Sequence, residues 1–218
     1  MIAIVTLVFF ISVIHDGCTQ KLGGMDCPNV ANMDSRLRRI VLEHHNWKRY
    51  FLTGGYPFPD KHEVKYPTAS DMNVLYYDCE LEFDSYEIAS RGIADRPNFD
   101  FVGSNNASVK YVNFNSDSIT EMVDKWWETS LSGGNLVNLT PSQANRKMIP
   151  FLQMANGKTN KIGCAYEVSK DDSGDDYVLF VCSYGTEKIR VGNPIYTRGP
   201  PCGSCRNKCT FGNRLCAT

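Results

Sequence analysis

The chain has 218 residues, a length typical of one large domain or of one domain with a small appendage. Its hydrophobic fraction of 42% and charged fraction of 22% are ordinary for a globular protein and exclude an intrinsically disordered chain. The formal net charge of -1, with no basic stripe along the sequence, gives no electrostatic basis for binding nucleic acid or an anionic membrane.

The N-terminal segment has the features of a signal peptide. Ile2 to Ile14 is an almost unbroken apolar run, too short to span a bilayer and of the length of a signal-peptide core. No Lys or Arg precedes the run and the small-residue cleavage pattern near Gly17 is weak, so a buried strand and a membrane anchor stay open as alternatives. We expect residues 1–18 to be cleaved and the protein to be extracellular.

The first helical pattern covers residues 36–51. Asp34 or Ser35 can cap its N-terminus, and Gly54 ends it. We expect an apolar stripe on one side of this helix and a cluster of arginines on its solvated side. The stripe consists of Leu37, Ile40, Val41, His44, Trp47 and Phe51, and the arginines are Arg36, Arg38 and Arg39.

Two further helices are predicted. One begins at Cys79 and ends before Pro97, and the other is capped by Ser116 or Asp117 and stops at Gly133. A loop or short helix then leads to residues 148–154. The apolar face of the third helix consists of Ile119, Met122, Val123, Trp126 and Trp127. We expect one of the two tryptophan rings to point inward and the other to be partly exposed.

Three irregular segments are candidate binding surfaces, since binding often uses long loops on a rigid scaffold. Residues 57–69 contain prolines and no sustained period. Residues 99–115 are rich in Asn and Ser, which predicts a loop with at most a short extended piece. The acidic segment from Asp171 to Asp176 lacks the ordered oxygen spacing of a calcium loop, so a solvated turn is favoured.

The clearest strands come late in the chain and form a hairpin. Residues 162–168 and 177–184 are rich in aromatic and β-branched residues and flank a Gly/Asp/Ser cluster. Closing the hairpin could bring Cys164 and Cys182 within disulfide reach. The second strand is apolar at nearly every position, which favours a central strand. Helices first and strands late indicate an α+β fold, with helices layered on an antiparallel sheet.

Cysteine usage supports an extracellular location. If cleavage removes Cys18, eight of the nine cysteines remain, the even number that a disulfide framework requires. The C-terminal cluster could bind zinc, but thiols oxidise outside the cell, so two crossed disulfides are favoured. This cluster consists of Cys202, Cys205, Cys209 and Cys216. Glycosylation sequons at Asn106 and Asn138 fit the same compartment.

Histidine is scarce after the signal segment. Only His44, His45 and His62 are present, so a metal or hydrolase site that draws histidines from several parts of a fold has almost nothing to use. We expect His44 and His45 to be structural groups that hydrogen-bond to neighbouring loops. The sequence has no phosphate-cradling glycine loop, no nucleophile elbow and no Arg-Gly-Asp tripeptide.

Four motifs together resemble a known family. His45-Asn46-Trp47-Lys48-Arg49 matches a first-helix pattern His-Asn-x-x-Arg, and Tyr77 to Glu82 resembles the start of a second helix. Leu179 to Tyr184, followed by Gly192-Asn193, resembles a C-terminal signature, and the cysteine-rich tail resembles a hinge extension. From residue 27 to its end the chain is similar to the CAP superfamily, also called SCP/TAPS, in its Ancylostoma-secreted-protein-like nematode branch.

The resemblance implies a three-layer α-β-α sandwich, with a CAP domain over residues 27–193 and a cysteine-rich, hinge-like extension over residues 194–218. It also implies a set of disulfides. These are Cys27 to Cys79, Cys164 to Cys182, Cys202 to Cys209 and Cys205 to Cys216.

The chain departs from this family at its central cleft, where typical members carry two His and two Glu that can bind a divalent cation. The four matching positions are Arg96, Ser104, Thr129 (or Ser130, depending on which tryptophan is aligned) and Pro150. A guanidinium stays protonated and proline has no side-chain donor, so neither can hold a metal. We therefore expect no cation site, no cofactor and no catalysis in the cleft.

The resemblance implies a binding protein rather than an enzyme. The branch includes secreted parasite effectors that engage host cell-surface proteins, and its hookworm members that block platelet or leukocyte adhesion target integrins. We expect a host cell-surface receptor, an integrin, as the partner, while the contact residues and the oligomeric state stay unassigned. A carrier of sterol or fatty acid is the alternative, and a divalent-metal hydrolase ranks third.

Overall fold

The computed structural model describes residues 26–29, 31–55, 66–92, 103–132, 136–171, 173–185 and 187–218. The predicted signal peptide at residues 1–18, His62, Arg96 and most of the candidate loop at 57–69 lie outside these ranges. Within them, no helix combines the length and the apolar composition that a membrane crossing needs.

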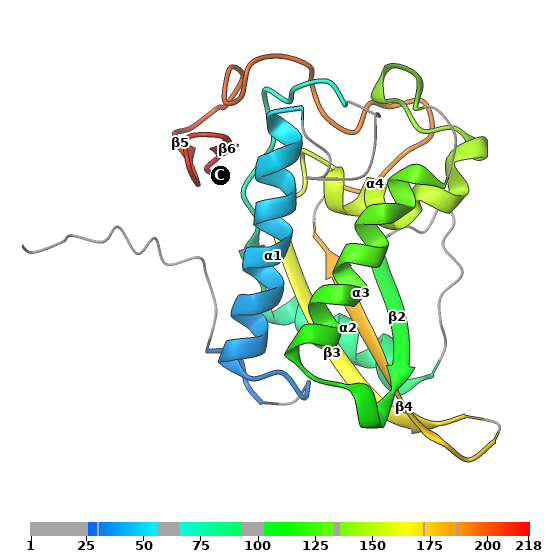
Figure 1. Ribbon diagram of the computed structural model, residues 1–218. Coiled ribbons are helices and arrows are strands. Elements are labelled where there is room, and N and C mark those ends of the chain that lie inside the picture. The colour runs from blue at the N-terminus through cyan, green and yellow to red at the C-terminus, as the bar shows by residue number, and fades with distance from the viewer. Residues whose placement is uncertain are drawn as a thin grey trace, which may run out of the picture.

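A four-stranded sheet with the order β1-β3-β4-β2 forms the centre of the fold (Figure 1). The hairpin of β3 (Lys161–Lys170) and β4 (Asp176–Tyr184) occupies the two inner positions, which confirms the prediction of a central hairpin. One part of the prediction is wrong. The edge strand β1 (Tyr76–Tyr77) runs parallel to β3, so the sheet is mixed rather than antiparallel.

The other edge strand, β2 (Ser104–Lys110), corrects the prediction of a loop at residues 99–115. This segment pairs with β4 along its whole length in antiparallel register. Its Asn and Ser residues have low intrinsic strand propensity, but the backbone ladder to the buried β4 overrides that preference. Residues 104–110 of the candidate binding loop are therefore a strand, longer than the short extended piece predicted, and a single 3-10 turn follows at Tyr111–Asn113, while residues 99–102 lie outside the described ranges.

Helices cover both faces of the sheet, which confirms the three-layer α-β-α sandwich. In Figure 1, α2 (Cys79–Ser90) lies behind the sheet, and α1 (Ser35–Thr53) and α3 (Ser116–Glu128) lie in front of it, together with α4 (Ile149–Ala155). The α2 helix packs so closely that a Cβ on Gly163 of β3 would overlap its backbone.

The ends of the helices follow the local sequence. The Asp34 carboxylate caps α1 by accepting a hydrogen bond from the Leu37 amide at 2.7 Å, and Gly54 is the C-cap, as predicted. Asn115, rather than Ser116 or Asp117, caps α3. The α2 helix ends at Ser90, well before Pro97, because Gly92 takes a left-handed backbone conformation with φ of 64°.

The buried face of α1 is rotated from the predicted stripe. Trp47 is 49% exposed and Phe51 is 39% exposed, whereas five polar side chains of the helix are buried: Arg38, His45, Asn46, Arg49 and Thr53. The prediction that Arg38 lies on the solvated side is wrong, because its guanidinium forms a bidentate ion pair with Glu82 of α2 at 2.7 and 2.8 Å. Partners elsewhere in the chain therefore decide which side of α1 faces the core.

The predicted apolar face of α3 is buried as expected, but neither of its tryptophans is partly exposed. Trp126 stacks on Phe180 of β4 and donates its ring N–H to the Asn106 carbonyl at 2.9 Å. Trp127 packs edge-on against Phe151 of α4. Both rings are buried because α3 lies between the sheet on one side and α4 on the other.

The C-terminal tail is bound to the body of the fold. Its residues Ile195, Tyr196 and Leu215 belong to the main hydrophobic core, and a small hairpin of β5 (Cys209–Thr210) and β6 (Leu215–Cys216) packs beside α1 (Figure 1). The structure contains the pairs that the resemblance implies. They are Cys27–Cys79, Cys164–Cys182, Cys202–Cys209 and Cys205–Cys216.

Candidate functional site

Three of the four degenerate cleft positions meet where β2, α3 and α4 come together. The Thr129 hydroxyl, at the C-cap of α3, donates to the Trp126 carbonyl at 2.7 Å and accepts from the Phe151 amide at 3.1 Å. The Pro150 carbonyl accepts a hydrogen bond from the Asn105 amide at 3.0 Å. Both polar groups are therefore already engaged in holding α4 against its neighbours.

Ser104 is joined to the same junction through its backbone. The side-chain carbonyl of Gln153 on α4 accepts hydrogen bonds from the backbone amides of Gly103 and Ser104, at 2.9 and 3.3 Å. Gln153 is buried, so these bonds attach the start of β2 to α4. Sequence reasoning did not single out Gln153 or Asn105, because the position of each beside the cleft follows only from the packing of α4 on β2.

A buried chain of hydrogen bonds continues from this junction to α1. Asn105 also donates to the Tyr184 hydroxyl at 3.1 Å, and that hydroxyl lies 3.0 Å from Nε2 of His45. The Nδ1 atom of His45 lies 2.8 Å from the Val41 carbonyl, which can only accept. The imidazole proton is therefore on Nδ1, and Nε2 accepts from Tyr184. Among the described residues, none donates to Oδ1 of Asn105.

Burial keeps both titratable groups of this chain neutral. It lowers the pKa of His45 to about 3, and it raises the pKa of Tyr184 far above its usual value. A neutral imidazole whose two nitrogens are both engaged is a poor general base and offers no free lone pair to a metal. His45 partners its own helix and a strand, so the predicted partner, a loop, is wrong.

The residues at the junction do not fit a divalent cation. Serine and threonine hydroxyls, a proline and one amide oxygen supply no carboxylate or free imidazole, the groups that bind zinc in proteins. Within the described ranges, no three His, Cys, Asp or Glu side chains come together in a group that could hold a metal. No reaction step through a metal can therefore be derived from this junction.

A second polar group joins α1 to α3. Asp124 lies 2.7 Å from Nε2 of His44 and 2.6 Å from Nζ of Lys48. Partial burial of Asp124 opposes its charge, but the two hydrogen bonds prevail and lower its pKa below the usual value. His44 therefore pairs with a helix rather than with a loop as predicted. The group is an interhelical ion pair and contains one carboxylate.

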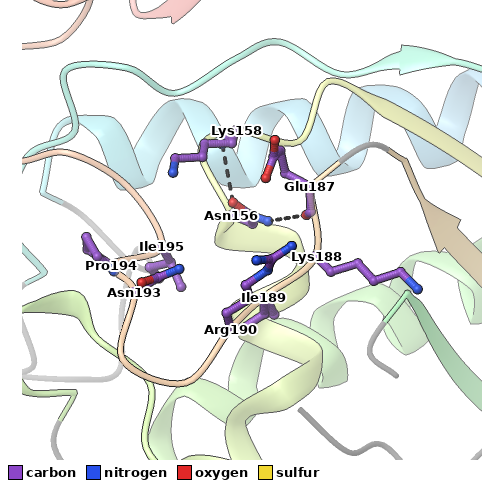
Figure 2. A pocket seen from close by; sticks show the side chains of 9 residues that line it. All are labelled: Asn156, Lys158, Glu187, Lys188, Ile189, Arg190, Asn193, Pro194 and Ile195. Carbon is purple, nitrogen blue, oxygen red and sulfur yellow. Dashed lines mark hydrogen bonds between the residues drawn. The ribbon is translucent and has the colours of Figure 1, made fainter. Parts of the chain in front are cut away.

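Two cavities lie along the C-terminal segments. The smaller, of about 150 Å³, is lined by residues 187–190 and 193–195 together with Asn156 and Lys158, and Figure 2 shows the Arg190 guanidinium pointing into it. Asn156 is fixed there by hydrogen bonds to the Glu187 carbonyl and the Lys158 amide. The larger, of about 610 Å³, lies between the tail and the body and shares Lys158 and Glu187. In each cavity, most of the lining residues are polar.

The structure places the remaining sequence candidates apart from each other. Asn138 is exposed and accepts from Arg198, whereas Asn106 is half-buried within β2. The acidic segment after β3 forms an exposed turn in which the Asp171 carboxylate accepts from the Ser173 and Asp175 amides. Glycosylation at both sequons stays a prediction.

The buried neutral His45 predicts a pH-dependent stability. In the unfolded chain a histidine takes up its proton near pH 6.5, but the folded state takes it up only near pH 3. Stability contributed by this residue is therefore complete above pH 6.5 and is lost, by about 1.4 kcal/mol per pH unit, as the pH falls from 6.5 towards 3.

We expect this loss in urea unfolding measured at several pH values, and a flatter profile in His45→Gln. The substitution also removes hydrogen bonds and so lowers the free energy of unfolding at neutral pH. The comparison therefore uses only the slope of the free energy of unfolding against pH. An unchanged slope between pH 6 and 4 in the variant would show that His45 is not the responsible group.

Comparison with known proteins gives a consistent result. The family model of the cysteine-rich secretory protein family, CAP, matches residues 42–184. The Ancylostoma secreted protein of Ancylostoma caninum is 28% identical over 207 residues, which cover 88% of this chain and 46% of that protein. The chain therefore spans about half the length of this relative.

Solved structures share the fold. The chain is 26% identical in sequence to NaASP2, whose structure was solved with Zn²⁺. The two structures superpose with a TM-score of 0.72 over 87% of this chain and 99% of the NaASP2 chain. The hookworm platelet inhibitor is 24% identical, with a TM-score of 0.68 and coverage of 88% and 95%. At that identity the second likeness establishes the fold alone.

Proposed function

Because the chain belongs to the cysteine-rich secretory protein (CAP) family, we propose that it is a secreted, non-enzymatic parasite effector that binds a protein on host cells. The observation that carries this proposal is the state of the central junction. Ser104 holds the fold together there through its backbone amide, Thr129 through its hydroxyl and Pro150 through its carbonyl, and none of the three carries an imidazole or a carboxylate that could act as a base.

Secretion is supported by the disulfides and by the relatives. Four disulfides among the described residues are stable in an oxidising compartment and rare in the cytosol. The matching relative is by name a secreted protein. The apolar segment at residues 2–14 supplies the export signal in this proposal.

The finer part of the proposal is the target. The resemblance to hookworm effectors, one of which is by name a platelet inhibitor, motivates inhibition of integrin-dependent adhesion of platelets or leukocytes. The alternative, a sterol or fatty-acid carrier, needs an apolar groove, and the two cavities along the C-terminal segments are not such a groove because their lining is mostly polar. Uptake of labelled sterol or fatty acid would test that alternative directly.

Platelet adhesion tests the target. Purified, disulfide-intact protein is titrated into resting and activated human platelets on fibrinogen and on collagen, beside a family member that retains the two His and two Glu. We expect inhibition by this protein but not by the control. Unimpaired adhesion on both surfaces at micromolar protein would exclude platelets. Stoichiometric zinc retained through dialysis would contradict the absence of a cation site.

A further inference from the structure

Four aromatic side chains form a patch on the outer side of α1. This aromatic patch consists of Trp47, Tyr50 and Phe51 of α1 and Phe211 of the turn between β5 and β6. The Trp47 and Phe211 rings meet edge to face with centroids 5.2 Å apart, and the Arg214 guanidinium lies 4.7 Å from the centre of the Tyr50 ring. Residues more than 150 positions apart therefore build one surface.

The patch is pre-organised. Gly212 has φ of 65°, and a Cβ at this position would lie 2.7 Å from the Tyr50 ring, so a glycine is needed for the turn to approach α1. The disulfides Cys202–Cys209 and Cys205–Cys216 hold the two strands that carry this turn. A rigid surface loses little conformational entropy on binding, which favours affinity.

Two rings of the patch, Tyr50 and Phe211, are half-buried, and Phe211 packs against the hydrophobic core, but the other two rings are exposed. Trp47 is 49% exposed and Phe51 is 39% exposed, while the buried side of the same helix packs against the core. Clustered, exposed aromatic rings beside an arginine are the composition of binding hot spots, in which Trp, Tyr and Arg are enriched. The patch therefore has the chemistry of an interface.

The charge around the patch indicates the kind of partner. The tail at residues 194–218 carries four cations and no carboxylate, so the rest of the chain, with 19 cations and 24 anions, has a net charge of -5. The tail cations are Arg198, Arg206, Lys208 and Arg214. On the outward side of α1, Arg36, Arg39 and Glu43 are exposed, whereas Lys48 is ion-paired with Asp124 of α3. Figure 1 shows the β5–β6 hairpin beside α1.

We propose that the aromatic patch, Arg214 and the neighbouring tail cations Arg206 and Lys208 form a docking surface for an acidic, aromatic-containing segment of a host protein, whereas Arg198 donates to Asn138 and lies outside this surface. The cations attract the acidic segment, and the rings of the patch pack against its apolar side chains. A protein segment fits better than a sulfated polysaccharide, because the patch offers four apolar rings in addition to charge. This proposal rests on the proposed function and adds the surface that would perform it.

Trp47 makes the proposal measurable without a label. The other two tryptophans, Trp126 and Trp127, are buried, so only Trp47 responds directly to an occupant. The probe is a random copolymer of glutamate and tyrosine, excited at a wavelength that tyrosine does not absorb. We expect a saturable blue shift or quench of the emission that weakens with added salt. Trp47→Phe should abolish the signal and retain binding by interferometry.

Matched variants identify the surface. We expect Phe51→Ser and Arg214→Glu each to weaken copolymer binding about tenfold. The controls are Phe83→Ser, a phenylalanine on α2 that is 49% exposed, and Lys125→Glu, an exposed cation on α3, and both should bind as the unchanged protein does. Unchanged thermal midpoints show that all four variants fold. Equal losses in the variants and their controls would overturn the assignment of the surface.

The class of partner is tested with other polyanions. Polyglutamate should bind more weakly than the copolymer, because it lacks rings, and heparin should compete only weakly. Heparin binding tighter than the copolymer, or no saturable copolymer signal, would overturn the proposal. Platelet adhesion is measured separately. Copolymer binding without inhibition of platelet adhesion would reject the platelet target but keep the surface. Inhibition of adhesion by the double variant Phe51→Ser with Arg214→Glu would reject this surface.

Discussion

Replacing Arg49 by methionine is expected to lower the free energy of unfolding by about 4 kcal/mol. The guanidinium is fully buried and donates to backbone carbonyls from three segments of the chain: Asn73, Met154, Asn156, Gly157 and Thr159. Burial lowers the pKa of Arg49 to about 9, so the group stays charged at neutral pH. Methionine is similar in volume but donates no hydrogen bond, so the Asn73, Met154 and Thr159 carbonyls lose the guanidinium, while the Gly157 and Asn156 carbonyls keep backbone donors.

The same substitution at Arg39 is the matched control. Arg39 lies on the exposed side of the same helix, so Arg39→Met should stay within about 0.5 kcal/mol of the unchanged protein. Arg49→Lys should fall between the two, since an ammonium has three donors and lacks the planar fork of the guanidinium. Urea unfolding with the disulfides intact measures all three. Equal stabilities of the two methionine variants would contradict the role assigned to Arg49.

Replacing Glu82 by glutamine is the second change with a large expected effect, about 3–5 kcal/mol of lost stability. Glu82 is buried between α2 and α1, where it accepts a bidentate pair of hydrogen bonds from Arg38 and a third from the Tyr77 hydroxyl at 2.6 Å. Glutamine is similar in size but neutral, so the Arg38 guanidinium would be buried without a counter-charge.

Removing both charges separates the contribution of the Arg38–Glu82 ion pair from the cost of leaving one charge buried without a partner. Arg38→Met with Glu82→Leu should be more stable than Glu82→Gln alone, because no unpaired charge remains and Tyr77 keeps the Cys164 carbonyl as an acceptor. Glu80→Gln, an exposed neighbour on α2, is the control and should change little. A double variant less stable than the single one would show that the ion pair itself stabilises the fold.

Much of the fold could be predicted from local sequence. The ends of α1, the apolar face of α3 and the central hairpin depend on capping residues, on a period of 3.6 and on β-branched composition, all of which act within a few residues. The absence of a metal tetrad stays a prediction. It rests on the resemblance, which assigned the four positions, and on the fact that serine, threonine and proline carry no imidazole or carboxylate.

Only the tertiary structure decided which polar side chains are buried. Arg38 has its partner 44 positions away and Arg49 has acceptors more than 100 positions away, so no local pattern on α1 could show that they face the core. The same reason applies to Asn105, His45 and Tyr184, which three separate elements bring into one chain of hydrogen bonds. Burying a polar group is favourable only with a partner, and the partner is a property of the fold.

The order of the helical and extended patterns predicted an α+β fold, and the even number of cysteines predicted a disulfide framework. The packing of the C-terminal tail on α1 decided that Trp47 and Phe211, 164 positions apart in the sequence, share one surface. Hydrophobic periodicity predicted that Trp47 faces the core, because the pattern considers apolar residues alone. It could not take into account the polar side chains that occupy the buried side of α1. Exposure of a side chain is set by what covers it, and distant segments supply that cover.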